Sequence, residues 1–119
     1  MKTSYKQISA FITRDGSLIR ELMHPDTHNN RNQSLAEATI EQGQQTQLHC
    51  HIMSEELYFI LGGTGLMTLG EQQFMVVEGD TICINPGVAH KIHNTGEDTL
   101  RILCCCSPAY QHHDTEILE

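Results

Sequence analysis

Basic and aromatic side chains are scarce in this sequence. Its 119 residues include 7 lysines and arginines but 15 aspartates and glutamates, which gives a formal net charge of −8 at pH 7. Nucleic acids and anionic membranes are bound through basic patches, so this balance predicts that neither is a partner. Tryptophan is absent and aromatic residues make up only 5% of the chain, so the core must be mainly aliphatic.

Long apolar segments and a disulfide pattern are also missing. No apolar run is long enough to span a bilayer, and the polar residues 1–6 lead into no signal-peptide core. The five cysteines are an odd number, and three of them are adjacent at residues 104–106, which is not the spacing of a disulfide framework. We therefore predict a cytoplasmic protein with reduced thiols and no membrane contact.

Short strand-like runs, in contrast, are abundant. From residue 34 onward, stretches of alternating apolar and polar residues are interrupted by glycine, proline, asparagine or aspartate at intervals of roughly 8–12 residues. No segment has the periodicity of a convincing helix of about ten residues. This pattern predicts an all-β protein, a sandwich or barrel, and the chain length fits a single domain.

Three parts are expected along the chain. Residues 1–33 are predicted to form an N-terminal strand and loop segment, with a short edge strand at 17–22, and residues 34–108 to form the β-barrel. The polar tail, residues 109–119, either packs as a flap or stays loose. In the first case a lid over the barrel mouth would come from Tyr110, His112, His113 and Asp114.

A pair of histidines separated by one residue is the first sign of a functional site. A strand places alternate side chains on one face, so His49 and His51 point the same way and Cys50 points the other way. Glu56 lies an odd number of residues from His51, so an unbroken strand would put it on the opposite face. A turn at residues 52–55 removes that conflict and brings the carboxylate toward the two imidazoles.

A third imidazole, His90, follows a tight turn at residues 85–87 and arrives from another strand. Three imidazoles and a carboxylate are a suitable ligand set for a divalent transition metal. Two more histidines, His24 and His28, lie in a polar loop. Solvent exposure is the favoured interpretation for them, and metal binding is the alternative.

The glycines around these residues complete a pattern that resembles the cupin family. The family's first motif is a glycine, five residues, His-x-His, three or four residues, a glutamate, six residues and a glycine. The matching residues here are Gly43, His49, His51, Glu56 and Gly63. Glu55 with Gly62 also satisfies the spacing, but Glu56 follows the commoner arrangement of similar sequences.

The second motif of the cupin family is a glycine, five residues, Pro-x-Gly, two residues, a histidine, three residues and an asparagine. The matching residues are Gly79, Gly87, His90 and Asn94. Asn85 stands where the family usually has proline, which affects the rigidity of the turn and not the ligand set. The two motifs together cover residues 43–94.

This resemblance implies a double-stranded β-helix, or jelly-roll barrel, with a metal inside it, commonly in a homodimer. It implies that the metal ligands are His49, His51, Glu56 and His90. It does not fix the metal, because three histidines and one glutamate suit Fe, Mn, Ni, Zn, Co or Cu. Four protein ligands leave one or two positions open on a five- or six-coordinate ion, which allows Lewis-acid chemistry or activation of water or dioxygen.

The complete ligand set favours a metal-dependent small-molecule enzyme of the dioxygenase, isomerase, cyclase or lyase type. The alternative is a non-catalytic, metal-bound small-molecule binding or sensor protein, because one fold hosts many functions. Tyr58 shares the inward face with Glu56 and is either a proton donor or a core residue. A phosphosugar substrate is disfavoured, because Lys91 is predicted to point away from the cavity and the direction of Arg101 is not fixed.

The three adjacent cysteines have two interpretations. Free cysteine is a small, mostly apolar residue that suits a buried strand. Alternatively, Cys104 and Cys106, which share a face with Ile102, line the cavity and affect its redox chemistry or its metal binding. Cys105 falls on the opposite face, because consecutive strand residues alternate.

Overall fold

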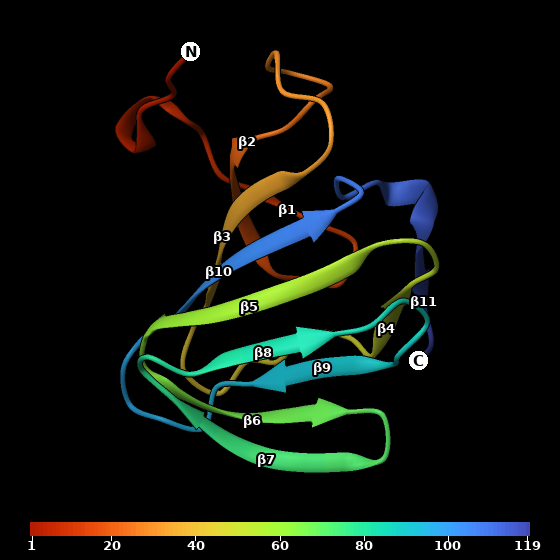
Figure 1. Cartoon of the computed structure of the whole chain (residues 1–119). Helices are drawn as coiled ribbons and strands as arrows, with labels where there is room; N and C mark the ends of the chain where they lie inside the picture. Colours follow the sequence, from red (N-terminus) through yellow and green to blue (C-terminus); the bar gives the residue numbers. More distant parts are fainter.

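Two antiparallel sheets face each other in the computed structural model, which describes residues 1–119 (Figure 1). One sheet has the strand order β1-β2-β3-β10-β5-β8 and the other β11-β4-β9-β6-β7. This architecture confirms the predicted all-β, single-domain, double-stranded β-helix. The strands are β1 (Phe11–Ile12), β2 (Leu18–Met23), β3 (Ser34–Ile40), β4 (His49–His51), β5 (Glu55–Gly62), β6 (Thr64–Leu69), β7 (Gln72–Val77), β8 (Thr81–Ile84), β9 (His90–His93), β10 (Leu100–Ser107) and β11 (Thr115–Ile117).

Alternation along each strand decides which side chains enter the space between the sheets. On β5, the buried side chains of Glu56, Tyr58 and Ile60 alternate with the exposed side chains of Leu57 and Phe59. The interior is mainly aliphatic, as the composition predicts. Its fully buried side chains include Ile60, Met67, Ile92, Leu100 and Ile102.

The glycine that ends the first motif is required by close packing. Gly63 joins β5 to β6 with φ of +88°, a conformation that other residues rarely adopt. A Cβ atom at this position would lie 2.8 Å from the carbonyl oxygen of Thr99 and 2.9 Å from the Cα of Leu100. A larger residue would therefore push the β5–β6 connection away from the start of β10.

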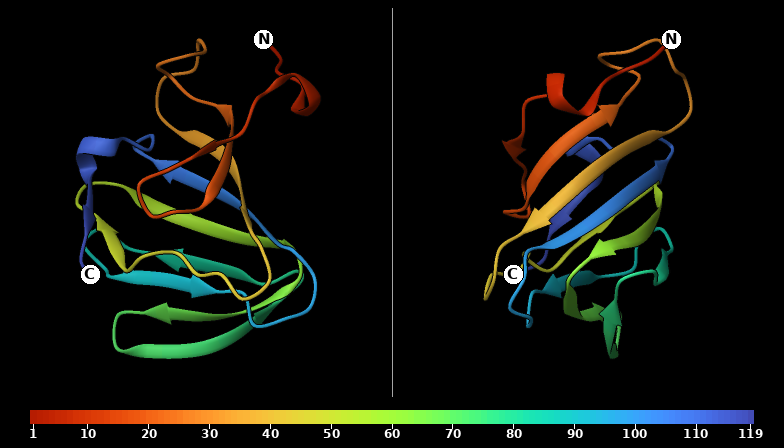
Figure 2. Two further views of the ribbon diagram at one scale, coloured as in Figure 1. Left: turned by 180° about the vertical axis from the view of Figure 1, so that it is seen from behind. Right: turned by 90° about the vertical axis from the view of Figure 1, so that its left-hand side faces the viewer.

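The edge-strand prediction for residues 17–22 is wrong. The strand there, β2, lies between β1 and β3, and β1 forms the edge of its sheet (Figure 2). Arg20 on β2 holds the N-terminal segment by donating hydrogen bonds to the carbonyl oxygens of Tyr5 and Ile8. β1 has only two residues, which pair with Leu18 and Ile19, and so short a strand leaves no alternating pattern in residues 1–16.

The C-terminal tail packs as an ordered flap. Its strand β11 pairs with β4, so that Thr115 lies opposite His51. Two three-residue 3-10 helices, Tyr5–Gln7 and His112–Asp114, are the other elements near the chain ends. No helix of the protein has the length and apolar character needed to cross a membrane. The division into 1–33, 34–108 and 109–119 stays a prediction.

Candidate metal centre

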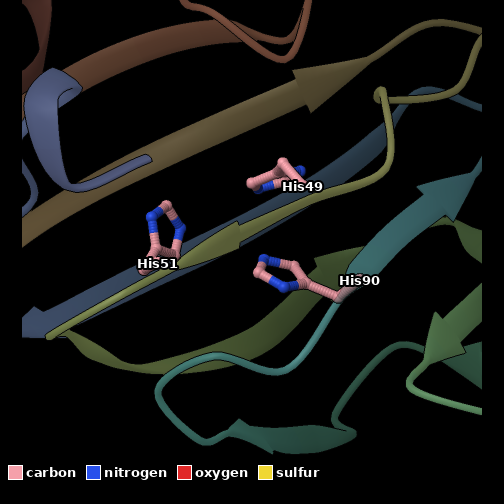
Figure 3. A group of neighbouring side chains, drawn as sticks. All are labelled: His49, His51 and His90. Atoms are coloured by element: carbon pink, nitrogen blue, oxygen red, sulfur yellow. The ribbon is translucent and has the colours of Figure 1, made fainter. Parts of the chain in front are cut away.

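Three imidazoles converge between the sheets. His49 and His51 come from β4 and His90 from the first position of β9, and one ring nitrogen of each lies within 4.8 Å of the other two (Figure 3). All three are nearly inaccessible to solvent. The strand argument for His49 and His51 is confirmed, because Cys50 points instead toward Glu116, with its Sγ 3.9 Å from the carboxylate.

Backbone contacts bring the two motif segments together at this point. His49 and His90 are paired across β4 and β9. The turn before His90 is tied to β4, because the backbone N–H of Gly87 donates a 2.7 Å hydrogen bond to the carbonyl oxygen of His51. At the far end of the motifs, the N–H of Gly43 donates to the carbonyl oxygen of Asn94 at 3.1 Å.

The tautomers of two rings follow from their hydrogen bonds. Nδ1 of His49 lies 2.7 Å from the carbonyl oxygen of Gln47, and Nδ1 of His90 lies 3.0 Å from that of Val88. A carbonyl oxygen can only accept, so Nδ1 carries the proton in both rings. In the neutral rings, each Nε2 therefore presents a lone pair to the shared space. Metal-binding histidines are commonly oriented in this way.

His51 reaches the same state through a side chain of the tail. Its Nδ1 lies 3.0 Å from the hydroxyl oxygen of Thr115, and that hydroxyl donates its own proton to the carbonyl oxygen of Gln111 at 3.0 Å. The hydroxyl oxygen must therefore accept from Nδ1 of His51. All three Nε2 atoms are thus lone-pair donors in the neutral rings.

Glu56 approaches two of these lone pairs. Its Oε1 lies 3.2 Å from Nε2 of His51 and 3.4 Å from Nε2 of His90, yet neither Oε1 nor Nε2 of His90 makes a hydrogen bond. Acceptors that face one another in a buried site need a proton or a cation between them. Ligands about 2.1 Å from a metal ion lie about 3.0–3.4 Å apart, so this spacing fits a shared ion.

The pKa values agree with a site that holds its ligands in their binding forms. Burial alone would raise the pKa of Glu56. Hydrogen bonds and positive charge from His51 and His90, when their Nε2 atoms carry protons in the metal-free protein, outweigh burial and lower the pKa to about 2. Burial, reinforced by the neighbouring His90, lowers the pKa of His49 below 6.5. A carboxylate and a neutral imidazole are the forms that bind a metal.

Sequence comparison agrees with this arrangement. A family model described as a Cupin domain matches residues 36–106. The chain belongs to the cupin family. It is 55% identical over 119 residues to the uncharacterized protein MJ1618 of Methanocaldococcus jannaschii, covering 100% of this chain and 95% of that protein.

Solved cupin-like structures share the fold at low sequence identity. A predicted oxalate decarboxylase from Thermotoga maritima matches with a TM-score of 0.80 at 22% identity, covering 91% of this chain and 99% of that one. Pac13, a nucleoside dehydratase of Streptomyces, matches with a TM-score of 0.82 at 14% identity, covering 100% of this chain and 91% of that one. At these identities the likeness shows the fold alone.

A cavity of this cupin is lined by His49, His51 and Glu56. Tyr58, Cys104 and Cys106 belong to its wall, as strand parity predicts. The thiol of Cys106 donates a hydrogen bond to Oε2 of Glu56 with an Sγ–O distance of 3.3 Å, and burial raises the pKa of this thiol. The placement of Cys104 and Cys106 on the cavity wall is thus confirmed, while Cys105 faces the other way. An effect of these thiols on redox chemistry or metal binding stays a prediction.

The loop histidines do not join the metal cluster, which contains only His49, His51 and His90. His24 is buried, with its Nε2 2.6 Å from the carbonyl oxygen of Tyr110, and it accepts the backbone N–H of Asp26 at Nδ1. His24 therefore fastens the N-terminal loop to the tail, and solvent exposure was the wrong interpretation for it.

Asp15 and Thr115 were not identified as residues of the site from the sequence, and Asp114 was expected there only as part of a lid. Asp114 accepts hydrogen bonds from the backbone N–H groups of Met53 (2.8 Å) and Ser54 (3.1 Å), and it thereby holds the turn between His51 and Glu56. Thr115 orients His51. Asp15 lines the cavity, with its Oδ2 3.5 Å from Nε2 of His49. Their local sequence carries no signal, because each acts across a contact between distant segments.

Tyr110 is the part of the predicted lid that reaches the cavity. Its ring lies edge-on to His51 with a centroid separation of 5.6 Å, and its hydroxyl contacts Thr13 and His112. The other members of the predicted lid have different surroundings: His112 and His113 are exposed, and Asp114 is buried under the turn. One side of the cavity is therefore closed by the tail and the N-terminal segment together.

Proposed function

We propose that His49, His51, Glu56 and His90 bind one divalent transition metal, chosen from Fe, Mn, Ni, Zn, Co or Cu. The observation that carries this proposal is the set of buried lone pairs without donors: three oriented Nε2 atoms and the unpartnered Oε1 of Glu56. When bound, such an ion supplies Lewis-acid polarisation or activation of an oxygen ligand. The protein's part is to hold the imidazoles neutral and the carboxylate ionised.

On this basis we propose a metal-dependent enzyme acting on a small molecule. A cavity beside a site with open metal positions gives a substrate access to the ion, and its wall combines apolar side chains with a few hydroxyls. Tyr58 is proposed to donate a proton or a hydrogen bond to the bound molecule, because its side chain is buried on the same face as Glu56 and lines the cavity. The reaction type is open among dioxygenase, isomerase, cyclase and lyase chemistry.

The alternative function is a metal-bound carrier or sensor. The feature that favours it is the resistance of Tyr58, the proposed proton donor, to ionisation, because burial raises its pKa well above 10. Turnover separates the two functions. A carrier binds its ligand without converting it, whereas an enzyme loses activity when Tyr58 is replaced by phenylalanine.

Metal analysis of the purified protein is the first test, followed by oxygen-uptake assays with candidate diols and diketones. The expected result is one metal per chain in the wild type and none in the double variant His49→Ala, His51→Ala. The matched control is His93→Ala, because His93 lies on β9 but faces away from His90. A wild type that purifies without metal and gains no thermal stability from any divalent ion would contradict the proposal.

We also propose that the protein is a homodimer formed through the outer face of the larger sheet. Leu35, Leu57 and Phe59 are exposed there, on β3 and β5. Register places Leu103 and Cys105 of β10 beside them, which makes the apolar patch continuous across three strands. The variant Phe59→Glu should convert a dimer to a monomer in light scattering. A wild-type monomer at micromolar concentration would contradict this assembly.

A reducing, cytoplasmic location is proposed from the thiols. All five cysteines are free, and three of them are buried. The acidic composition supports the absence of nucleic acid among the partners. Cell fractionation, and a binding assay with duplex DNA at low salt, would test these two points.

A further inference from the structure

The wall of the cavity carries negative charge and no positive side chain. Its 21 residues include the carboxylates Asp15, Glu21 and Glu56, and neither lysine nor arginine is among them. Six hydroxyl-bearing residues complete the polar part of the wall besides Tyr58, namely Thr13, Ser17, Ser34, Thr46, Tyr110 and Thr115. Protein sites for carboxylates and phosphates normally supply arginine, lysine or clustered N–H donors, so this wall has the opposite character.

Three arginines that are sequence neighbours of wall residues are engaged elsewhere. Arg14 donates to the carbonyl oxygens of His112 and Thr115 at 3.0 Å each. Arg20 donates to backbone carbonyls of the N-terminal segment, and Arg101 pairs with Glu37. Since each guanidinium already has a partner, none is free to turn inward and neutralise an anionic ligand.

Asp15 has one oxygen left for a ligand. Its Oδ1 accepts both the backbone N–H and the hydroxyl of Ser17, at 3.0 and 2.7 Å. Its Oδ2 receives no hydrogen bond and lies 3.5 Å from Nε2 of His49. The residue is only 9% exposed, so this oxygen faces the cavity and not bulk water. A carboxylate oxygen at the cavity wall that receives no hydrogen bond from the protein can accept one from a bound molecule.

Glu56 and His90 also present atoms without partners to the ring cluster. Both Oε1 of Glu56 and Nε2 of His90 are buried without hydrogen-bond partners. A metal ion satisfies these two atoms under the proposed function. Oδ2 of Asp15 then remains beside His49, where a molecule bound to the ion would meet it.

We propose that the cavity selects a small uncharged or positively charged molecule whose O–H or N–H group donates a hydrogen bond to Oδ2 of Asp15, and that it disfavours carboxylates and phosphates. This inference rests on the proposed metal site. The free space is about 50 Å³, enough for roughly four water molecules, so the ligand is small. A ligand that turns an anionic group toward Asp15 meets a like charge in a site with little water to screen it.

The test compares two probes of equal size, glycolamide and glycolate. Glycolamide carries an NH₂ donor at the position where glycolate carries an anionic oxygen. Calorimetry on the Co²⁺-loaded protein gives the dissociation constant of each probe. Because the ion is present in every variant, its own attraction for glycolate cancels when the ratio of the two constants is compared between variants. In Asp15→Asn the ratio should shift at least about tenfold toward glycolate, because one charge disappears and an amide donor replaces it. Glu21→Gln should shift it the same way, by less. Glu71→Gln, on the exposed β6–β7 turn, is the matched control and should not change it.

The outcomes separate the two proposals. Ratios that agree within about twofold in the wild type, Asp15→Asn and Glu21→Gln would overturn the selectivity for uncharged ligands while leaving the metal site intact. Loss of Co²⁺ from Asp15→Asn to the extent seen in His49→Ala would also overturn it, because Asp15 would then be a metal ligand. Failure of the wild type to take up Co²⁺ would overturn the metal site and the inference with it. If Asp15→Asn does not fold, the Glu21→Gln ratio decides.

Discussion

The motif segment, residues 43–94, and the two terminal segments, residues 11–17 and 108–117, contribute different parts of one site. All four proposed metal ligands come from the motif segment, and two of the rings are oriented by nearby backbone carbonyls. The terminal segments supply no ligand. They supply contacts to the ligands and to the turn between them, through Asp15, Asp114 and Thr115.

This difference shows that binding and selection are built from separate parts of the chain. The ligands need fixed spacing along strands, which a motif can specify. The selecting and orienting groups need only to reach the site, and they do so from both chain ends. Changes in the motif segment should therefore abolish metal binding, whereas changes in the terminal segments should weaken it or alter what binds beside the ion.

The largest effect is expected for His90→Ala. Removing this imidazole deletes one of the four proposed ligands. Loss of a residue that only orients a ligand lowers metal affinity by up to about 100-fold, so the affinity for Co²⁺ should fall by more than that here. Competition with a chelator measures the change. A variant that keeps wild-type affinity would remove His90 from the site.

A large effect on stability is expected for Asp114→Ala. The change leaves the backbone N–H groups of Met53 and Ser54 without their acceptor, which costs about 2 kcal/mol of unfolding free energy or more. Urea denaturation measures it, with Glu97→Ala as an exposed control. Equal midpoints for the two variants would show that the tail does not hold the turn.

A moderate effect is expected for Thr115→Val. Valine cannot accept the proton of Nδ1 of His51, so this ring is no longer oriented and the affinity for Co²⁺ should fall about tenfold. Thr115→Ser keeps the hydroxyl and should restore the affinity. If valine and serine behave alike, the hydroxyl does not act through His51.

The smallest effect is a pH dependence of the metal-free protein. The folded pKa of His49 is below 6.5, so the unfolded chain takes up a proton first as the pH falls, and the unfolding free energy should be lower at pH 5.5 than at pH 7.5. Glu56 adds nothing in this window, because its contribution is complete above pH 4.5 and is lost only as the pH falls toward 2. His49→Gln should flatten the slope. An unchanged slope would assign the dependence to other groups.

Strand and turn patterns predicted an all-β sandwich or barrel, and the resemblance to the cupin motifs implied the double-stranded β-helix and the cluster. Strand parity placed His49 with His51, required the turn before Glu56, and put Tyr58 and Cys106 on the inner face. Such features repeat along a strand, so they are visible in a single stretch of sequence.

The contributions of the chain ends were not predictable in this way. Asp15 stands in an Asp-Gly-Ser sequence typical of any turn, and Asp114 and Thr115 belong to a polar tail. Their roles arise only when β11 pairs with β4 and the N-terminal segment packs beside the tail. A pairing between residues about 60 apart leaves no periodic signal, since neither partner constrains its own neighbours.

The most direct test of the metal centre is a crystal structure of the Co²⁺-loaded protein with anomalous data at the cobalt edge. We predict one strong peak per chain, about 2.0–2.2 Å from Nε2 of His49, His51 and His90 and from an oxygen of Glu56. A peak at the thiols of Cys104 and Cys106, or no peak between the three rings, would contradict the account.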